Sequence, residues 1–178
     1  MTKSLIALLF AGCAFAQSPA AVNLLLDKQL RGVEQEIVPL IEAMPADKIN
    51  FAPTAGAFTG VRTFAEQAKH VAAVIYMVSA AANVEKVPVD LGGGENGPSS
   101  VKSKEEVVQF VKDAFAYAHK AMATLTADNL TKPVKSPFGE GQMTKGGAMF
   151  MAISHTFDHY GQMVVYARMN NIVPPASR

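Results

Sequence analysis

The chain has 178 residues, 49% of them hydrophobic, and a formal net charge of +1. This length and composition predict one folded domain with a real core and exclude a disordered protein. Because no dense run of Lys or Arg is present, we expect no nucleic-acid binding.

The first residues carry the pattern of a secretory signal peptide. Lys3 supplies a positive charge, residues 4–15 are almost wholly apolar, and Ala14-Phe15-Ala16 fits a small-x-small cleavage site. The apolar run is too short to span a bilayer comfortably. We therefore expect residues 1–16 to be removed and the mature protein to be periplasmic or secreted, with no stable membrane insertion.

Cys13 allows an alternative interpretation of the same segment. Phe10-Ala11-Gly12-Cys13 resembles a lipobox, so a lipoprotein anchored through Cys13 is the competing prediction. Cleavage after Ala16 would instead remove Cys13, the only cysteine of the chain. The mature protein would then have no disulfide, no cysteine-ligated zinc and no cysteine nucleophile.

Two segments in the first half have helical periodicity. Apolar residues three and four apart predict a helix from Pro19 to about Ala43, and Pro39 is expected to kink it. A second helix runs from the capping box Thr63-Phe64-Ala65-Glu66 to about Ala82. The Gly-rich residues 83–100 that follow are interpreted as a flexible surface loop, a possible rim over a pocket.

Two further helices complete the pattern. The third begins at the capping box Ser103-Lys104-Glu105-Glu106, and its apolar stripe extends to Leu125. After a loop with a short extended piece at 132–143, the fourth helix runs from about Thr144 to Asn170 or Asn171. Four such helices predict an all-α fold: residues 17–178 form a single antiparallel-type four-helix bundle with long connecting loops.

Three histidines are candidate metal ligands. His155 and His159 lie four residues apart on the fourth helix, so both imidazoles project from one face. His70 on the second helix could supply a third ligand, because bundle metal sites use inward residues of different helices. Each histidine taken alone could equally be a packing residue, so the prediction depends on their joint occurrence. Three ligands leave positions open, which is typical of a catalytic metal site.

Other metal or hydrolase patterns do not fit. A zincin needs His-Glu-x-x-His, but Thr156 stands where that glutamate would be. The chain contains no Glu-x-x-His pair for a di-iron centre and no Gly-x-Ser-x-Gly motif for a serine hydrolase.

Two polar residues could support the histidines. Glu66, one turn before His70, could orient the imidazole or act as a base, or it could only close the capping box with Thr63. Gln162, one turn past His159, could hydrogen-bond an imidazole or a substrate. No catalytic residue is assigned.

Other residues near the predicted site have more ordinary interpretations. Asp158 points away around the helix and is interpreted as a surface charge, and Tyr166 as a residue at the edge of the core. Gly161 is costly in a helix by about 1 kcal/mol and indicates close helix packing or ligand approach. His119 lies beside the apolar stripe of the third helix as a boundary residue.

These segments resemble the DinB-like (DinB/YfiT) superfamily of four-helix-bundle metal-binding proteins. The resemblance covers nearly the whole mature chain. The segments that match the family pattern are Thr63 to His70, His155-x-x-x-His159-Tyr160-Gly161-Gln162, Tyr166-Ala167-Arg168, residues 171–175 and Asn50-Phe51-Ala52-Pro53. Tyr160 departs from the pattern, since many members have an arginine there.

The resemblance implies one divalent metal ion on His70, His155 and His159, the same three residues that the spacing indicates. Three imidazoles suit several metals, so zinc or nickel is the first choice, with iron or manganese as alternatives. It also implies a small-molecule substrate, and a homodimer is possible. Some relatives transfer thiols such as mycothiol or bacillithiol, but those cofactors are chiefly cytosolic. For an exported protein we prefer metal-dependent hydrolysis, with thiol transfer still open. The alternative is a non-catalytic metal-binding or stress-related module.

Overall fold

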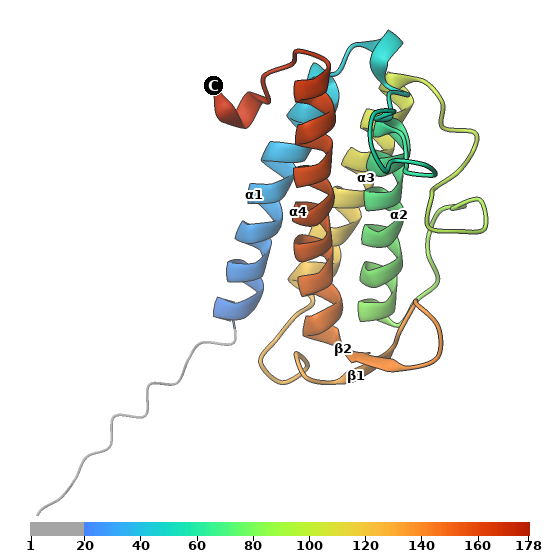
Figure 1. The fold of residues 1–178 in the computed structure, drawn as a ribbon. Helices are drawn as coiled ribbons and strands as arrows, with labels where there is room; N and C mark the ends of the chain where they lie inside the picture. Colours follow the sequence, from blue (N-terminus) through green and yellow to red (C-terminus); the bar gives the residue numbers. More distant parts are fainter. Residues whose placement is uncertain (1–19) are drawn as a thin grey trace, which may run out of the picture.

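Residues 20–178 are described by a computed structural model with four long helices and one short hairpin (Figure 1). The long elements are α1 (Ala20–Ala43), α2 (Phe64–Asn83), α3 (Lys104–Ala123) and α4 (Lys145–Met169). Single turns of 3-10 helix occupy Ala46–Lys48 and Pro175–Ser177. The predicted all-α four-helix bundle is confirmed, and its helices begin and end close to the expected residues. The signal-peptide and lipobox predictions lie outside the described residues.

The hairpin closes one end of the bundle. Strand β1 (Pro133–Lys135) pairs antiparallel with β2 (Gln142–Thr144), with Val134 opposite Met143. It is the extended piece expected within 132–143. Thr144 then caps α4 by accepting a hydrogen bond from the Gly147 amide.

The helices run in mixed directions. α2 packs mainly against α3 and α4, and α1 packs against the same two helices. In Figure 1, α1 and α4 run upward whereas α2 and α3 run downward, because residues 84–103 return along the side of the bundle. The antiparallel arrangement expected from the sequence therefore holds for α2 with α4 and for α1 with α3, whereas α2 and α3 are parallel.

α2 is the most deeply buried helix. Fifteen of its 20 residues are buried, and only its Glu66 is fully exposed before the last turns. The core cluster that contains the buried residues of α2 also includes Phe115, Met149 and Met163 of the other helices, which have no exposed surface. Burying a side chain of this size stabilises the fold by about 1.5–3 kcal/mol. Any polar group on the inner faces of α2 and α4 is thereby placed in an apolar environment.

The two predicted capping boxes set the starts of α2 and α3. The Thr63 hydroxyl accepts from the Glu66 amide, and the Glu66 carboxylate accepts from the Thr63 amide at 2.8 Å. Ser103 and Glu106 make the same reciprocal pair. α1 continues through Pro39 to Ala43. Among the described helices, none has the length and apolar character needed to cross a membrane.

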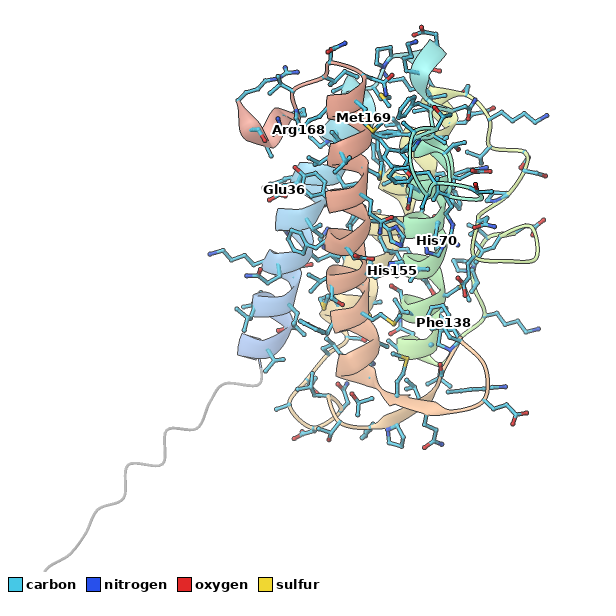
Figure 2. All side chains as sticks on the ribbon, viewed as in Figure 1. Glu36, His70, Phe138, His155, Arg168 and Met169 are labelled. Atoms are coloured by element: carbon cyan, nitrogen blue, oxygen red, sulfur yellow. The ribbon has the colours of Figure 1, made fainter. Side chains whose placement is uncertain are left out.

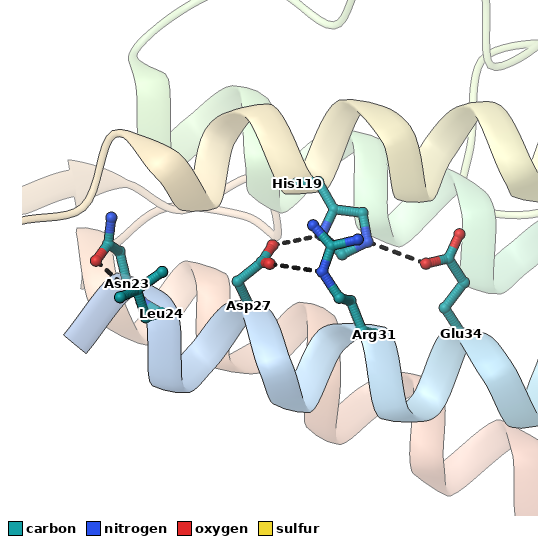
Figure 3. Close-up of polar contacts among 6 residues, drawn as sticks. All are labelled: Asn23, Leu24, Asp27, Arg31, Glu34 and His119. Carbon is teal, nitrogen blue, oxygen red and sulfur yellow. Dashed lines mark hydrogen bonds and ion pairs between the residues drawn. The ribbon is translucent and has the colours of Figure 1, made fainter. Parts of the chain in front are cut away.

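A charged cluster joins α1 to α3 (Figure 3). His119 lies between two carboxylates of α1, with Nδ1 2.5 Å from Asp27 and Nε2 3.0 Å from Glu34. Arg31 pairs with the same Asp27 at 2.8 Å. Burial alone would raise the pKa of Asp27, but the hydrogen bonds and charges of His119 and Arg31 outweigh it and lower the pKa. His119 is thus part of a polar contact between helices.

We predict that Asp27→Asn lowers the free energy of unfolding by about 1 kcal/mol at pH 7. A lowered folded-state pKa stabilises the fold above the unfolded-state pKa, and this stabilisation is lost as pH falls through the folded-state pKa. Urea unfolding in a descending pH series should therefore show the difference shrinking at acid pH. The exposed Asp128→Asn serves as the control and should change little. A pH-independent difference for Asp27→Asn would contradict the assignment.

Candidate metal centre

His70 on α2 meets His155 and His159 on α4 where these two helices pack together. The ring centroids are 4.9 Å apart for His70 and His155, 4.7 Å for His70 and His159, and 4.4 Å for His155 and His159. Figure 2 labels His70 on α2 and His155 on α4, the neighbouring helix. One nitrogen from each ring lies within 4.8 Å of the others, so the three histidines could hold one metal ion.

Burial favours the uncharged form of the three imidazoles. His70 and His159 are 4% and 7% exposed, and His155 is half-buried. Burial lowers the pKa of all three rings, and the neighbouring imidazoles lower the pKa of His155 and His159 further. The pKa of His159 falls to about 4. The neutral ring is the form that binds metals.

A backbone carbonyl fixes the tautomer of His70. Its Nδ1 lies 2.7 Å from the carbonyl oxygen of Glu95. A carbonyl oxygen can only accept, so Nδ1 carries the proton and donates it. The lone pair of Nε2 is then available, which is how metal-binding histidines are usually oriented.

A chain of side-chain amides fixes the tautomer of His159. The Asp158 carboxylate can only accept, so it takes a hydrogen bond from Gln162 Nε2 at 3.3 Å. Gln162 Oε1 must then face Gln67 Nε2, at 3.0 Å, and Gln67 Oε1 faces His159 Nδ1, at 2.5 Å. His159 therefore donates from Nδ1 and presents the lone pair of Nε2. The exposed Asp158, which can only accept, therefore fixes the donor and the acceptor of every hydrogen bond in this series.

The loop after α2 is anchored beside the histidines. Lys69 Nζ donates to the carbonyl oxygens of Pro98 and Val101, at 3.2 and 3.3 Å. Gly97 has a φ of +71°, and a Cβ at this position would lie 3.0 Å from the Lys69 Cβ. The prediction of a rim beside the site agrees with this arrangement. The loop is not only a surface connection, because it delivers the Glu95 carbonyl to His70.

The residues that sequence analysis placed near the histidines have different roles. Glu66 is exposed and its carboxylate accepts from the Thr63 amide, so the structure shows its capping role. Gln162 bonds Gln67 and not an imidazole. Gly161 is exposed with open space where a Cβ would stand, so it marks no close helix contact.

Two groups that orient the histidines, the Gln67 side chain and the Glu95 carbonyl, were not predicted from the sequence. Gln67 lies one turn before His70 on α2 and is 3% exposed, and a buried amide needs hydrogen-bond partners. Its position on the inner face of a buried helix was the signal that could have identified it. The Glu95 carbonyl could not be identified from the sequence, because every residue has a backbone carbonyl.

These observations define an all-α four-helix bundle with a histidine cluster that could hold a metal ion. The model of the DinB superfamily matches residues 29–163, a range that contains all three histidines. The chain therefore belongs to the DinB superfamily. No curated protein matches the chain.

Two solved structures have a similar fold. A DinB-like protein from Bacillus subtilis is 15% identical, with a TM-score of 0.61, over 83% of this chain and 92% of that protein. A DinB-like protein from Bacillus cereus is 17% identical, with a TM-score of 0.62, over 89% of this chain and 97% of that protein. At this level of identity the comparison shows the fold.

We predict that Gln67→Leu weakens metal binding about 10- to 100-fold, because His159 loses the acceptor that orients it. Gln67→Glu keeps an acceptor for His159 Nδ1, and the exposed Gln162 can turn away, so it should bind metal nearly as well as the wild type. Competition with a chromogenic zinc chelator gives both affinities, and thermal melts without metal report folding. Equal affinities for the Leu and Glu variants would contradict the role of Gln67.

We also predict that Gly97→Ala weakens metal binding, because the new methyl group would push the loop from Lys69 and withdraw Glu95 from His70. Gly93→Ala is the matched control. Both glycines have positive φ, but no atom lies within 4 Å of a Cβ at Gly93. The same chelator competition should separate the two variants. A loss of the same size in both would show that backbone strain alone is responsible.

Proposed function

We propose that this protein binds one divalent metal ion through His70, His155 and His159 and acts as an exported metal-dependent hydrolase on a small-molecule substrate. The observation that carries the proposal is the orientation of His70 and His159. Both rings donate from Nδ1 to protein acceptors, which leaves two Nε2 lone pairs available in the cluster. Two unprotonated Nε2 atoms in one buried cluster are expected of metal ligands, whereas histidines that only pack in a core have no need of them.

Three neutral nitrogens leave coordination positions for water and substrate. A divalent ion bound there would act as a Lewis acid and lower the pKa of its water. The residues of the chain hold the rings in place and exclude bulk water, since His70 and His159 are buried. Zinc or nickel fits three imidazoles well, and iron and manganese remain alternatives.

Hydrolysis is preferred to thiol transfer because the expected export would separate the protein from cytosolic thiol cofactors. A pocket of about 330 Å³ beside the cluster favours an enzyme over a non-catalytic module. Its walls include Gln67 and Gln162, the two amides that connect His159 to Asp158. Export itself depends on the signal-peptide pattern of residues 1–16.

We predict about one equivalent of metal per chain in wild-type protein, and a loss of nearly all of it in His70→Ala and His155→Ala, since two ligands hold zinc far more weakly than three. Metal analysis of protein purified from the exporting compartment measures this, and its N-terminal residue should be Gln17. His119→Ala is the control and should keep the metal, because His119 contacts Asp27 and Glu34 instead.

Turnover is tested on the same samples with a panel of chromogenic esters and amides. Hydrolysis that is lost with a chelator and in His155→Ala supports the enzyme. Bound metal without hydrolysis of any member would favour the binding module. No metal in wild-type protein, even after addition of zinc or nickel, would refute the proposal.

A further inference from the structure

The pocket beside the histidines has a polar lining with one positive charge. Its volume is about 330 Å³, and its walls are formed by Gly60, Val61, Arg62, Gln67, Asn96 and Gln162. The lining thus combines a guanidinium with three amide side chains. A volume of this size suits a small ligand, and the polar groups can fix its orientation.

Arg62 is held in this pocket from two sides. Its Nε donates to Asn96 Oδ1 at 2.8 Å, and its carbonyl oxygen accepts from the Tyr166 hydroxyl at 3.2 Å. Asn96 follows Glu95, the residue whose carbonyl orients His70. The loop that orients a histidine therefore also orients the arginine.

The guanidinium has no carboxylate partner in the part of the chain that is described. The ion pairs within residues 20–178 join other residues, and none includes Arg62. Arg62 nevertheless lies beside the histidine cluster. Gln67, which lines the same pocket, bonds His159, and Asn96, which bonds Arg62, follows the residue whose carbonyl bonds His70. Nε is occupied by Asn96, so the Nη groups are the donors that remain for a ligand.

We propose that this pocket binds the carboxylate of a small organic acid through Arg62, with the amides of Asn96 and Gln162 completing its surroundings. The inference rests on the proposed function and names the substrate class of the same site. Arginine presents paired donors that match the two oxygens of a carboxylate. Binding there would anchor a substrate beside the histidine cluster.

The charges around the pocket favour a carboxylate over a phosphate. Arg62 is the cation of the lining, whereas two carboxylates adjoin it: Asp158 accepts a hydrogen bond from the lining residue Gln162 at 3.3 Å, and Glu95 precedes the lining residue Asn96 in the sequence. A dianion would be repelled more strongly by these carboxylates than a monoanion. A singly charged carboxylate is therefore the better match to one guanidinium.

The test follows two signals by NMR while sodium propionate is added to the full-length chain, both metal-free and zinc-loaded. The Arg62 side-chain Nε–H resonance reports on the wild type, and the side-chain amide resonances of Gln162, which also lines the pocket, report on the wild type and on every variant. We expect a saturable shift of both signals in both wild-type samples. Arg62→Gln should weaken propionate binding about tenfold or more, because charge-assisted hydrogen bonds are lost. Arg168→Gln, which removes an exposed arginine at the end of α4, should leave binding unchanged.

A second variant and a second anion test the same proposal independently of Arg62→Gln. Asn96→Asp places a carboxylate of the protein itself against Arg62, so it should also weaken propionate binding. This variant tests the proposal even if Arg62→Gln fails to fold. Inorganic phosphate should bind more weakly than propionate to the metal-free wild type, where the carboxylates near the pocket repel a dianion more strongly. Tighter binding of phosphate, or equal propionate binding by wild type and both pocket variants, would overturn the proposal.

Metal content measured on each sample separates this proposal from the one on which it rests. Metal-loaded wild type whose Arg62 resonance does not respond to propionate would overturn the carboxylate pocket alone. Wild type that takes up no metal but shows the saturable Arg62 shift would refute the metal site and support the pocket.

Discussion

The placement of three uncharged imidazoles between α2 and α4 is the constraint on which the site depends. A buried imidazole needs a hydrogen-bond partner for the nitrogen that carries its proton. Glu95 and Gln67 supply acceptors for His70 and His159, and this choice of proton position leaves two lone pairs in the cluster. Acceptor nitrogens cannot hydrogen-bond to one another. A cation that accepted both lone pairs would stabilise their convergence.

The helix directions explain why a loop completes the site. Since α2 and α3 run parallel, residues 84–103 must travel back along the bundle to begin α3. A short turn between antiparallel helices would stay at one end and could not reach His70. The long return places Glu95 against His70 and Asn96 against Arg62. The long connection that this topology requires thus fixes the tautomer of His70 and the position of Arg62.

The sequence predicts the parts of this structure that depend on local periodicity. The capping boxes at Thr63 and Ser103 and the four-residue spacing of His155 and His159 need no knowledge of the fold. His70 required the further step of a bundle that brings α2 against α4. The Glu95 carbonyl and the placement of Arg62 could not be predicted, because they depend on the path of an irregular loop. Gln67 lies between these cases, since its helix face was predictable but its partner was not.

The charges near the site would couple binding of a metal ion at the histidines to binding of an anion in the pocket. Arg62 contributes one positive charge, and Glu95 and Asp158 contribute two negative charges, so these three groups sum to −1. A divalent cation would change this sum to +1. A monoanion in the pocket would then be attracted by the region as a whole and not only by Arg62. Binding of the metal and of a carboxylate should therefore reinforce each other, as expected where an ion and an anchored substrate act in one reaction.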